Sequence, residues 1–440
     1  MNYIKLILLL CLISLGSCDL DLVNPNAATE DDVFNTKDGL IALAVGVQQT
    51  YSTSALSTAI LTPSVTTRET AIMTTFANLE ELEEGASQLS GENGYTSRLF
   101  SNIMKSKGMA ESLIANIGNV SLDAGTASGL QAMGHLFKAM CLGHLAHNYE
   151  QVAIDNNLNN EATFSDRSAA LAEAISLLNS AASLLEGTPP SAEFNSSVGN
   201  EIDILNTCYA MLSRYNLVAG NYAEAVTAAN KVNLNATSVF SYDSQNPNQV
   251  YLGMFEGTIS YAPRSDFGLP AELAADPLDG RIAFYVDLAT AGPSLNNLPV
   301  ATMVAPFFNS STADIPLFLP GEVLLNKAEA LARLGNISEA ETTLNIVRNK
   351  TAADDIYGIG ANLPDTYSSG GNSDALLNEI YKNRRLECPF IGTSLDDSRR
   401  FNRPEPPTVT DLDSERNRNF YPYSDQERLS NPNTPADPPI

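Results

Sequence analysis

A short sequence motif that occurs twice constrains the fold of this chain more than any other feature. It reads GNYAEA at 220–225 and GNISEA at 335–340. In each copy Gly follows an amphipathic stretch, a polar residue comes next, and Ala begins a face of small side chains. Gly is favoured just after a helix ends, and small polar residues are favoured where the next one begins. Each copy therefore predicts two helices joined by a tight turn, and Ser338 and Glu341 have the spacing of a capping box.

Other stretches repeat apolar residues at helical spacing. The stripes are Met133, Phe137 and Cys141; Leu171, Ile175, Leu178, Ala182 and Leu185; and Leu205, Cys208, Leu212, Tyr215 and Ala219. Each stripe must pack against another element. Helix pairs joined by Gly, with small residues where they cross, resemble tetratricopeptide repeats. Because the two Gly turns lie far apart in the sequence, we expect scattered repeat pairs rather than a simple tandem solenoid.

Two long irregular sections interrupt the helical pattern, at 237–319 and from Pro404 to the end. The first is rich in Pro, Gly, Asn, Tyr and Phe, and the second carries the terminal prolines. Loops of this length within a compact domain are functional or braced on a scaffold. The chain has 440 residues, 44% of them hydrophobic, which is enough for one large domain or two. We therefore expect a mostly α-helical fold with long loops and little β-structure.

The N-terminus has the layout of a signal peptide. Lys5 precedes an apolar run from Leu6 to Leu15, and ten helical residues cover about 15 Å, roughly half of a bilayer's hydrocarbon thickness. The exit Leu15–Gly16–Ser17–Cys18 resembles the lipobox of bacterial lipoproteins, in which the Cys becomes the first mature residue and carries acyl chains. The alternative is an ordinary signal peptide with a stray Cys. We expect no other stretch to be long and apolar enough to span a membrane.

Composition excludes several classes of partner and chemistry. The net charge of −26 argues against nucleic acid, whose phosphates require Lys and Arg, and against an anionic lipid surface. The five Cys are widely spaced and do not predict a disulfide framework. Cys141, Cys208 and Cys388 lie in apolar helical contexts, so we expect them to be small buried hydrophobes.

No catalytic or metal-binding motif stands out. His144 and His147 are close enough on one helix to share a metal ion, but no Cys or acidic residue completes the set nearby. A thiolate at Cys141 is disfavoured on an apolar face. The acidic pairs, such as Glu80 and Glu81, are typical of solvated surface. We therefore expect no metal, no cofactor and no enzymatic activity.

Several segments together resemble the SusD/RagB family of Bacteroidetes lipoproteins. The lipobox is followed by DLDLVNP at 19–25 and ATEDDVF at 28–34, and 129–149 resembles the family's first repeat helix. The strongest match is EVLLNKAEA at 322–330, with the Gly335 turn and LNIVR at 344–348 after it. Further matches are 377–387 (LNEIYKNRRLE), DDSRR at 396–400, FYPYS at 420–424, and NPN at 431–433. These matches span nearly the whole chain in the family's order.

This resemblance implies a SusD-like fold, in which scattered repeat helices form a scaffold for ligand-binding loops. It implies a signal peptide at 1–17 and one domain at 18–440. We divide that domain into a tether (18–34), a helical repeat region (35–235), a loop-rich ligand section (237–319), and the last repeat pair with the C-terminal region (320–440). Family members are surface-exposed, lipid-anchored proteins of the outer membrane. They bind an oligosaccharide, or in some branches a peptide, for a TonB-dependent SusC-like transporter, and they are not enzymes.

A sugar-binding site needs exposed aromatic faces, together with polar groups for the hydroxyls. In SusD-like proteins two loop regions hold the ligand, and two regions of this chain have suitable residues. The candidates are Arg68, Phe76, Asn78 and Tyr95, with Glu69 and Arg98 beside them, and then Tyr261, Arg264, Phe267 and Tyr285, with Tyr251 and Phe255. The alternative for each aromatic is packing inside the fold. The chain has no Trp, which leaves room for a smaller, charged or peptide ligand. An adaptor that contacts only the transporter is a further alternative.

Residues 377–387 resemble the family's "ERR-x-E" helix, and the two arginines of this segment have a structural interpretation. Arg384 and Arg385 are spaced to pair with Glu379 and Glu387 on the same helix, or to clamp loop carbonyls. Arginines in such positions usually brace their neighbours. We therefore expect these two to stabilise the fold rather than to contact a ligand.

Overall fold

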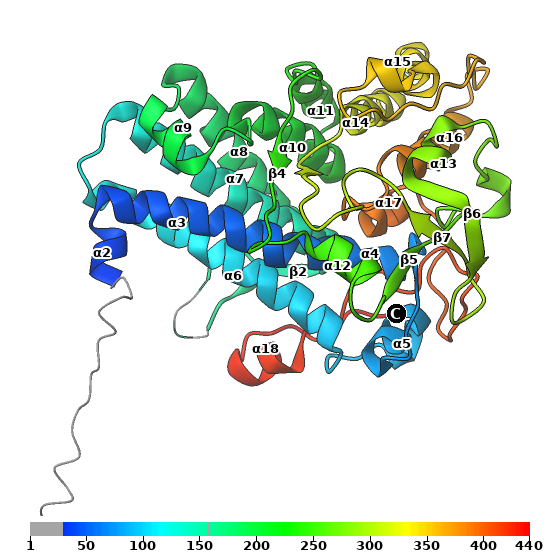
Figure 1. The fold of residues 1–440 in the computed structure, drawn as a ribbon, viewed down its shortest axis with the longest axis horizontal. Coiled ribbons are helices and arrows are strands. Elements are labelled where there is room, and N and C mark those ends of the chain that lie inside the picture. The colour runs from blue at the N-terminus through cyan, green and yellow to red at the C-terminus, as the bar shows by residue number, and fades with distance from the viewer. Residues whose placement is uncertain (1–29, 157–158, 160) are drawn as a thin grey trace, which may run out of the picture.

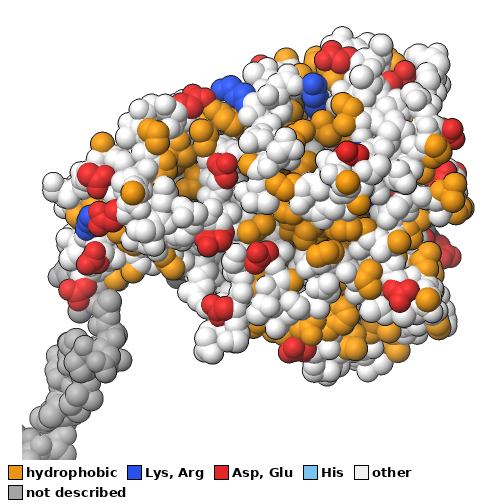
Figure 2. Space-filling model, turned by 45° about the horizontal axis from the view of Figure 1, so that its top comes forward, with side chains coloured by type: hydrophobic (Ala, Val, Ile, Leu, Met, Phe, Trp, Pro, Cys, Tyr) orange, Lys and Arg blue, Asp and Glu red, His pale blue; other side chains and the backbone are white. Residues whose placement is uncertain are grey.

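The computed structural model describes residues 30–156, 159 and 161–440. Over these ranges the chain folds mostly into helices, as predicted, and its strands form four two-stranded antiparallel ribbons (Figure 1). The predicted signal peptide, Cys18 and most of the tether lie outside the described residues. The charged side chains visible in Figure 2 are mostly acidic, in line with the net charge of −26.

The N-terminal half is a bundle built around one buried helix. Its helices are α2 (Glu30–Phe34), α3 (Lys37–Thr50), α4 (Leu56–Thr66), α5 (Ala77–Glu84), α6 (Gly94–Asn116), α7 (Ala124–Asn148), α8 (Arg167–Gly187) and α9 (Ala192–Val198). A π-helical segment at Tyr51–Ala55 joins α3 to α4 without a break. Helix α7 packs against α3, α6, α8 and α10, and its C-terminal half is buried all round. The predicted stripe of Met133, Phe137 and Cys141 is therefore part of the core.

The predicted Gly turns join two helix pairs, α10 (Ile204–Ala219) with α11 (Tyr222–Ala229) and α14 (Pro320–Arg333) with α15 (Ile337–Asn349). Gly220 and Gly335 both have a φ of +82°, a left-handed conformation that favours Gly. Although the pairs are far apart in sequence, α11 packs directly on α14. The repeat pairs therefore adjoin in space, and the loop-rich section is an insertion between them.

The predicted capping box at Ser338 and Glu341 is wrong. Helix α15 begins at Ile337, so both residues already lie inside it. Glu341 instead accepts a hydrogen bond from the backbone N–H of Ser369 at 2.6 Å. The carboxylate thus holds a distant loop rather than its own helix end.

The insertion contains short elements that return to the helical body. They are β4 (Val239–Phe240), α12 (Gln249–Phe255), β5 (Tyr261–Pro263), α13 (Gly280–Tyr285), β6 (Val286–Pro293), β7 (Pro299–Met303) and β8 (Ile315–Pro316). Strand β4 pairs with β8 and closes the insertion at its base. Strand β5 pairs with β1 (Thr70–Ile72), and β6 forms a hairpin with β7. A bridge between Arg264 and Val300 links these two ribbons.

The C-terminal region braces the rest of the molecule. It contains α16 (Ser373–Glu387), α17 (Ser394–Arg400) and α18 (Asp425–Ser430). The fourth ribbon lies earlier in the chain, between α7 and α8, and joins β2 (Gln151–Ala153) to β3 (Phe164–Asp166). Tyr421 and Tyr423 are buried against Tyr149 at the end of α7. Of the two possibilities for the irregular C-terminal section, a functional loop or one braced on the scaffold, these residues show the second.

Helix α8 contradicts one expectation from the sequence. Its most apolar 18 residues have a mean hydropathy of 1.3, so by length and composition alone it could cross a membrane. In the structure it packs along α7 and α10 and buries Ala170, Ala174 and Ala181. The apolar residues of α8 therefore pack against neighbouring helices of the same domain.

Candidate functional site

The pairing of β1 with β5 brings together the two regions that the sequence predicted separately. Thr70 lies opposite Pro263, and Ile72 lies opposite Tyr261. The ring of Tyr95 meets the ring of Tyr261 edge to face, with centroids 6.4 Å apart. In Figure 1 α5, β5 and the β6–β7 hairpin lie in the right-hand part of the molecule, and α12 lies between β5 and its centre. We call this surface, formed by residues 73–78, 95–98 and 251–263, the α5–α12 face.

Amide side chains fix the part of the face that belongs to α5 and α6. The side-chain oxygen of Asn78 accepts a hydrogen bond from the N–H of Gly94 at 2.8 Å. Asn93 donates to the carbonyl of Asn78 at 2.7 Å and caps α6 by accepting from the N–H of Tyr95 at 3.0 Å. The N-termini of α5 and α6 are thereby tied together. Phe76, just before α5, has 49% of its surface exposed.

An open groove of about 270 Å³ lies between α12, β5 and the β6–β7 hairpin. Its lining is mainly apolar and includes Phe255, Tyr261, Pro263, Pro293, Val300 and Met303, while Thr290 and Thr302 add hydroxyl groups. Met73 and Ile259 on its rim are exposed. Sequence reasoning missed these two residues, because nothing in an isolated Met or Ile indicates that tertiary structure will leave it at a groove.

Four of the predicted ligand-binding residues are buried. Arg68 donates to the backbone carbonyls of Glu83 at 2.7 Å and Asp411 at 3.0 Å, and its burial lowers its pKa to about 10. Tyr285 donates to the carbonyl of Glu387 at 3.0 Å. Tyr261 and Phe267 are buried in the core. In this conformation Arg68, Phe267 and Tyr285 lie inside the fold, and Tyr261 reaches only the wall of the groove.

The remaining candidates lie nearer the surface. Arg264 is half-buried and pairs with Asp266 at 2.5 Å, and its backbone N–H donates to the carbonyl of Glu69 at 2.8 Å. Phe76, Asn78 and Tyr95 keep exposed surface on the face. The ligand-binding role of all eight residues stays a prediction.

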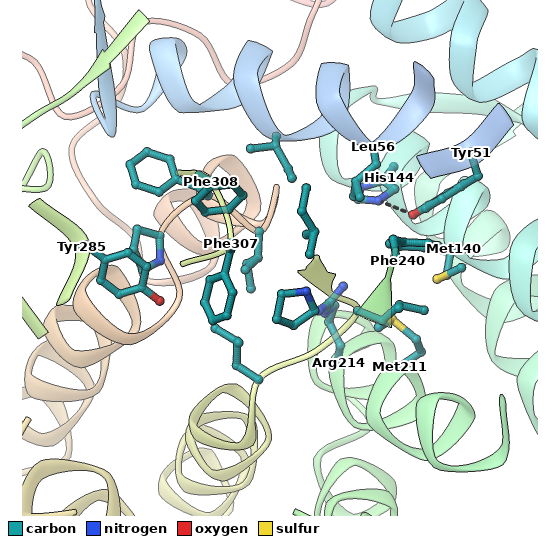
Figure 3. A pocket seen from close by; sticks show the side chains of 18 residues that line it. Tyr51, Leu56, Met140, His144, Met211, Arg214, Phe240, Tyr285, Phe307 and Phe308 are labelled. Atoms are coloured by element: carbon teal, nitrogen blue, oxygen red, sulfur yellow. Dashed lines mark hydrogen bonds between the residues drawn. The ribbon is translucent and has the colours of Figure 1, made fainter. Parts of the chain in front are cut away.

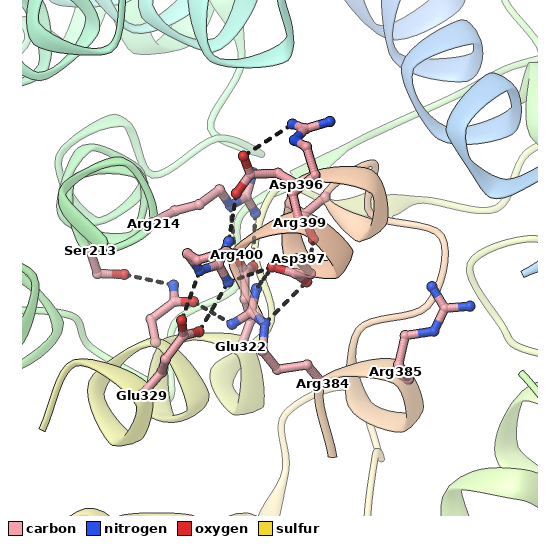
Figure 4. A network of polar contacts seen from close by, with 12 residues as sticks. Ser213, Arg214, Glu322, Glu329, Arg384, Arg385, Asp396, Asp397, Arg399 and Arg400 are labelled. Carbon is pink, nitrogen blue, oxygen red and sulfur yellow. Dashed lines mark hydrogen bonds and ion pairs between the residues drawn. The ribbon is translucent and has the colours of Figure 1, made fainter. Parts of the chain in front are cut away.

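A network of buried ion pairs joins α14, α16 and α17 (Figure 4). Arg384 donates to Asn326 at 2.7 Å and pairs with Asp397 at 3.0 Å, while Arg400 pairs with Glu329 at 2.8 Å. Burial alone would raise the pKa of Asp396, but the guanidinium groups of Arg167, Arg400 and Arg399 hold it well below its usual range. The expectation that the arginines of α16 have a structural role is confirmed.

Their partners, however, are not on the same helix. Arg384 and Arg385 make no ion pair with Glu379 or Glu387; Glu387 pairs instead with Arg281 at 3.1 Å and with Lys350. Arg385 clamps loop carbonyls, which was the other possibility from the sequence. It donates to Thr67 at 2.8 Å and to Phe267 at 2.7 Å.

Of the histidines, only His144 lines a small internal cavity, which has a volume of about 30 Å³ (Figure 3). The Nε2 atom of His144 lies 2.8 Å from the hydroxyl of Tyr51, and burial lowers the pKa of His144 to about 3. Burial also lowers the pKa of His147 to about 4 and raises that of the Cys141 thiol well above its usual range. Within the described ranges, no three His, Cys, Asp or Glu side chains are grouped to hold a metal ion. The cavity is far too small for a sugar ring.

A second open groove lies on the repeat region, away from the α5–α12 face. It has a volume of about 510 Å³ and is lined by α8, α10 and α11. Two of its three charged residues are paired with each other, because Glu186 lies 3.3 Å from Lys231, and Glu186 also accepts a hydrogen bond from Tyr209. Those internal partners make it a weaker candidate for a ligand site.

Comparison of the fold defines the class of protein. A SusD homologue from Bacteroides thetaiotaomicron superposes with a TM-score of 0.70 at 12% identity, over 93% of this chain and 99% of that one. A SusD-like carbohydrate-binding protein from Bacteroides vulgatus superposes with a TM-score of 0.69 at 15% identity, over 91% and 98%. A protein from the same species, described as a sugar-binding protein, superposes with a TM-score of 0.67 at 16% identity, over 92% and 98%. The fold is that of SusD superfamily proteins.

Comparison of the sequence points to the same family. Residues 300–436 match the model of the SusD family. The resemblance to the SusD/RagB family is therefore confirmed, in sequence over the C-terminal third and in fold over nine tenths of the chain. A search of curated proteins found no match.

Proposed function

We propose that this protein is a surface lipoprotein that binds an oligosaccharide on the α5–α12 face and delivers it to a SusC-like TonB-dependent transporter, without catalysing a reaction. The observation that carries the proposal is the β1–β5 pairing, which gathers Phe76, Tyr95 and Phe255 at one end of the molecule. The SusD-like fold, shared with proteins described as sugar-binding, supports it.

The chemistry of the face suits a sugar. Aromatic rings pack against the C–H surfaces of sugar rings, and amides, guanidinium groups and hydroxyls bond to sugar hydroxyls. Phe76 and Tyr95 supply rings, Thr302 supplies a hydroxyl group, and Arg98 supplies N–H donors. A groove of this kind has concave, mostly apolar walls with a few polar groups, as small-ligand sites usually do.

Calorimetry and affinity gels with a glycan panel test binding, using protein that begins at Asp19. We expect Phe76→Ala and Tyr95→Ala each to weaken binding about 10-fold, since an aromatic contact contributes ~1–1.5 kcal/mol. Tyr222→Ala is the matched control, because α11 lies far from the face in Figure 1. If the Phe76→Ala and Tyr95→Ala proteins lose only their binding to the transporter, the protein is an adaptor that contacts the transporter alone. Release of sugar by the pure protein would show that it is a hydrolase.

Peptide binding is a second candidate, favoured by the composition of the groove. Met73, Ile259, Val300 and Met303 provide aliphatic and thioether surface, which suits apolar side chains better than sugar hydroxyls. The chain also lacks Trp. Binding of peptides by the purified protein, with no binding across the glycan panel, would replace the oligosaccharide proposal with this one.

The membrane attachment and partner are tested separately. We propose that Cys18 carries acyl chains that anchor the protein in the outer membrane, facing outward. In cells, Cys18→Ala should move the protein out of the membrane fraction and abolish its labelling by a fatty acid analogue. Co-purification with a transporter of the TonB-dependent class tests the proposed partner.

A further inference from the structure

Arg98 differs from the other arginines that the structure describes. It lies in the second turn of α6 with its side chain exposed. Within the described ranges it is the single exposed arginine that makes no ion pair; Arg428, also exposed, pairs with Asp437 at 2.8 Å. The chain has 51 acidic residues and 25 basic ones, so carboxylate partners are abundant. An unpaired guanidinium on this surface is therefore available to a ligand.

The guanidinium is also held in place. Its central carbon lies 4.8 Å from the centroid of the Tyr95 ring, and its Nε donates to the carbonyl of Gly94 at 3.1 Å. The backbone N–H of Gly94 in turn donates a hydrogen bond to the side-chain oxygen of Asn78. A guanidinium stacked on an aromatic ring loses little further freedom when it binds, which favours a fork-like contact with an anion.

The N-terminus of α6 also favours an anion at this position. Arg98 and Tyr95 lie in the first two turns of α6, whose N-terminus adds a partial positive charge. The nearby carboxylate of Glu81 is bonded to the side chain of Asn93 at 2.9 Å rather than to Arg98. The charge of Arg98 thus stands beside the aromatic ring that the proposed site would use for a sugar.

Resting on the proposed function, we infer that the α5–α12 face binds acidic oligosaccharides, whose carboxylate or sulfate group pairs with Arg98 while a sugar ring packs on the neighbouring aromatic side chains. An Arg pairs with either anion through two parallel N–H···O bonds. Neutral oligosaccharides of the same length should bind more weakly, because they leave the guanidinium without its partner.

The test compares matched ligands by calorimetry. The probes are uronate-containing oligosaccharides, the same compounds with their carboxyl groups reduced to alcohols, and sulfated oligosaccharides. We expect the wild-type protein to bind an acidic probe at least 10-fold more tightly than its neutral counterpart. Arg98→Gln should abolish this difference, and Arg98→Lys should restore part of it. Lys105→Gln is the matched control, since Lys105 is exposed two turns further along α6 and forms no ion pair with any residue that the structure describes.

The outcomes separate this inference from the proposed function. Equal binding of acidic and neutral probes, unchanged by Arg98→Gln, would overturn the inference and leave oligosaccharide capture standing. Binding of peptides alone, or of no probe, would overturn both. Preference for sulfated over uronate probes, or the reverse, would identify the anionic group. Circular dichroism of Arg98→Gln should match the wild type, because the side chain is exposed.

Discussion

The guanidinium of Arg385 donates to the backbone carbonyl of Phe267 at 2.7 Å. The same group also donates to Thr67 at 2.8 Å, three residues before β1. One side chain of α16 therefore holds the segment that precedes β1 and the segment that follows β5, which lie at the same end of this antiparallel ribbon. The C-terminal region of the chain thus positions the α5–α12 face without contributing to its surface.

Loss of this clamp should destabilise the fold. In Arg385→Gln the carbonyls of Thr67 and Phe267 and the buried carboxylate of Glu69 would lose a charged partner. We expect a loss of about 2–4 kcal/mol in the free energy of unfolding, measured with urea. Arg385→Lys should recover little, because an ammonium cannot reach both carbonyls in the same geometry. Arg428→Gln, which removes an exposed ion pair, should change stability by less than about 1 kcal/mol. Equal effects of the two changes would contradict the clamp.

Gly321 makes room for a buried carboxylate. It lies in the first turn of α14, where an added methyl group would overlap the side chain of Glu387. Glu387 is fully buried and pairs with Arg281 and Lys350, so displacing it would disturb both pairs. We expect Gly321→Ala to reduce the free energy of unfolding by about 2–4 kcal/mol. Gly118→Ala is the control, because no atom lies within 4 Å of the added methyl group. A Gly321→Ala protein as stable as the control would show that α14 and α16 pack differently.

The buried histidines should make the protein sensitive to acid. Burial lowers the pKa values of His144 and His147 to about 3 and about 4, below the usual 6.5. Below pH 6.5 the unfolded chain therefore binds protons that the folded chain does not, and stability falls as the pH falls towards 4. At pH 5 each histidine should reduce the free energy of unfolding by about 2 kcal/mol relative to pH 8.

A single variant isolates this effect. Neither ring nitrogen of His147 has a hydrogen-bond partner among the described residues, so His147→Leu leaves no other buried polar group without its hydrogen bond. Urea unfolding at pH 8 and pH 5 should show a smaller difference for His147→Leu than for the wild type. His135→Leu, at a half-exposed position of α7, should change the difference less. A wild-type protein with the same stability at both pH values would contradict burial of the histidines.

The sequence predicted local features best where a backbone or a stripe demands one residue type. Gly220 and Gly335 indicated their turns because a left-handed φ favours Gly, and the stripe at Met133, Phe137 and Cys141 indicated a buried helix face. The stacking of α11 on α14 could not be predicted, because it depends on how the insertion folds back between them.

The candidate site was predicted in outline only. The sequence marked two loop regions with aromatic and polar residues, and the structure brings them together at Tyr95 and Tyr261. Which side chains are exposed depends on tertiary contacts, for which the local sequence carries no signal. Tyr285 is buried and donates a hydrogen bond to Glu387, about a hundred residues away, whereas Ile259 is exposed.

The most direct test of the account is hydrogen–deuterium exchange of the protein with and without its tightest-binding oligosaccharide from the panel. Exchange reports which backbone amides a bound ligand protects. We predict slower exchange in residues 73–98 and 251–263, and unchanged exchange in the groove formed by α8, α10 and α11. Protection confined to that second groove, with none at the α5–α12 face, would contradict the account.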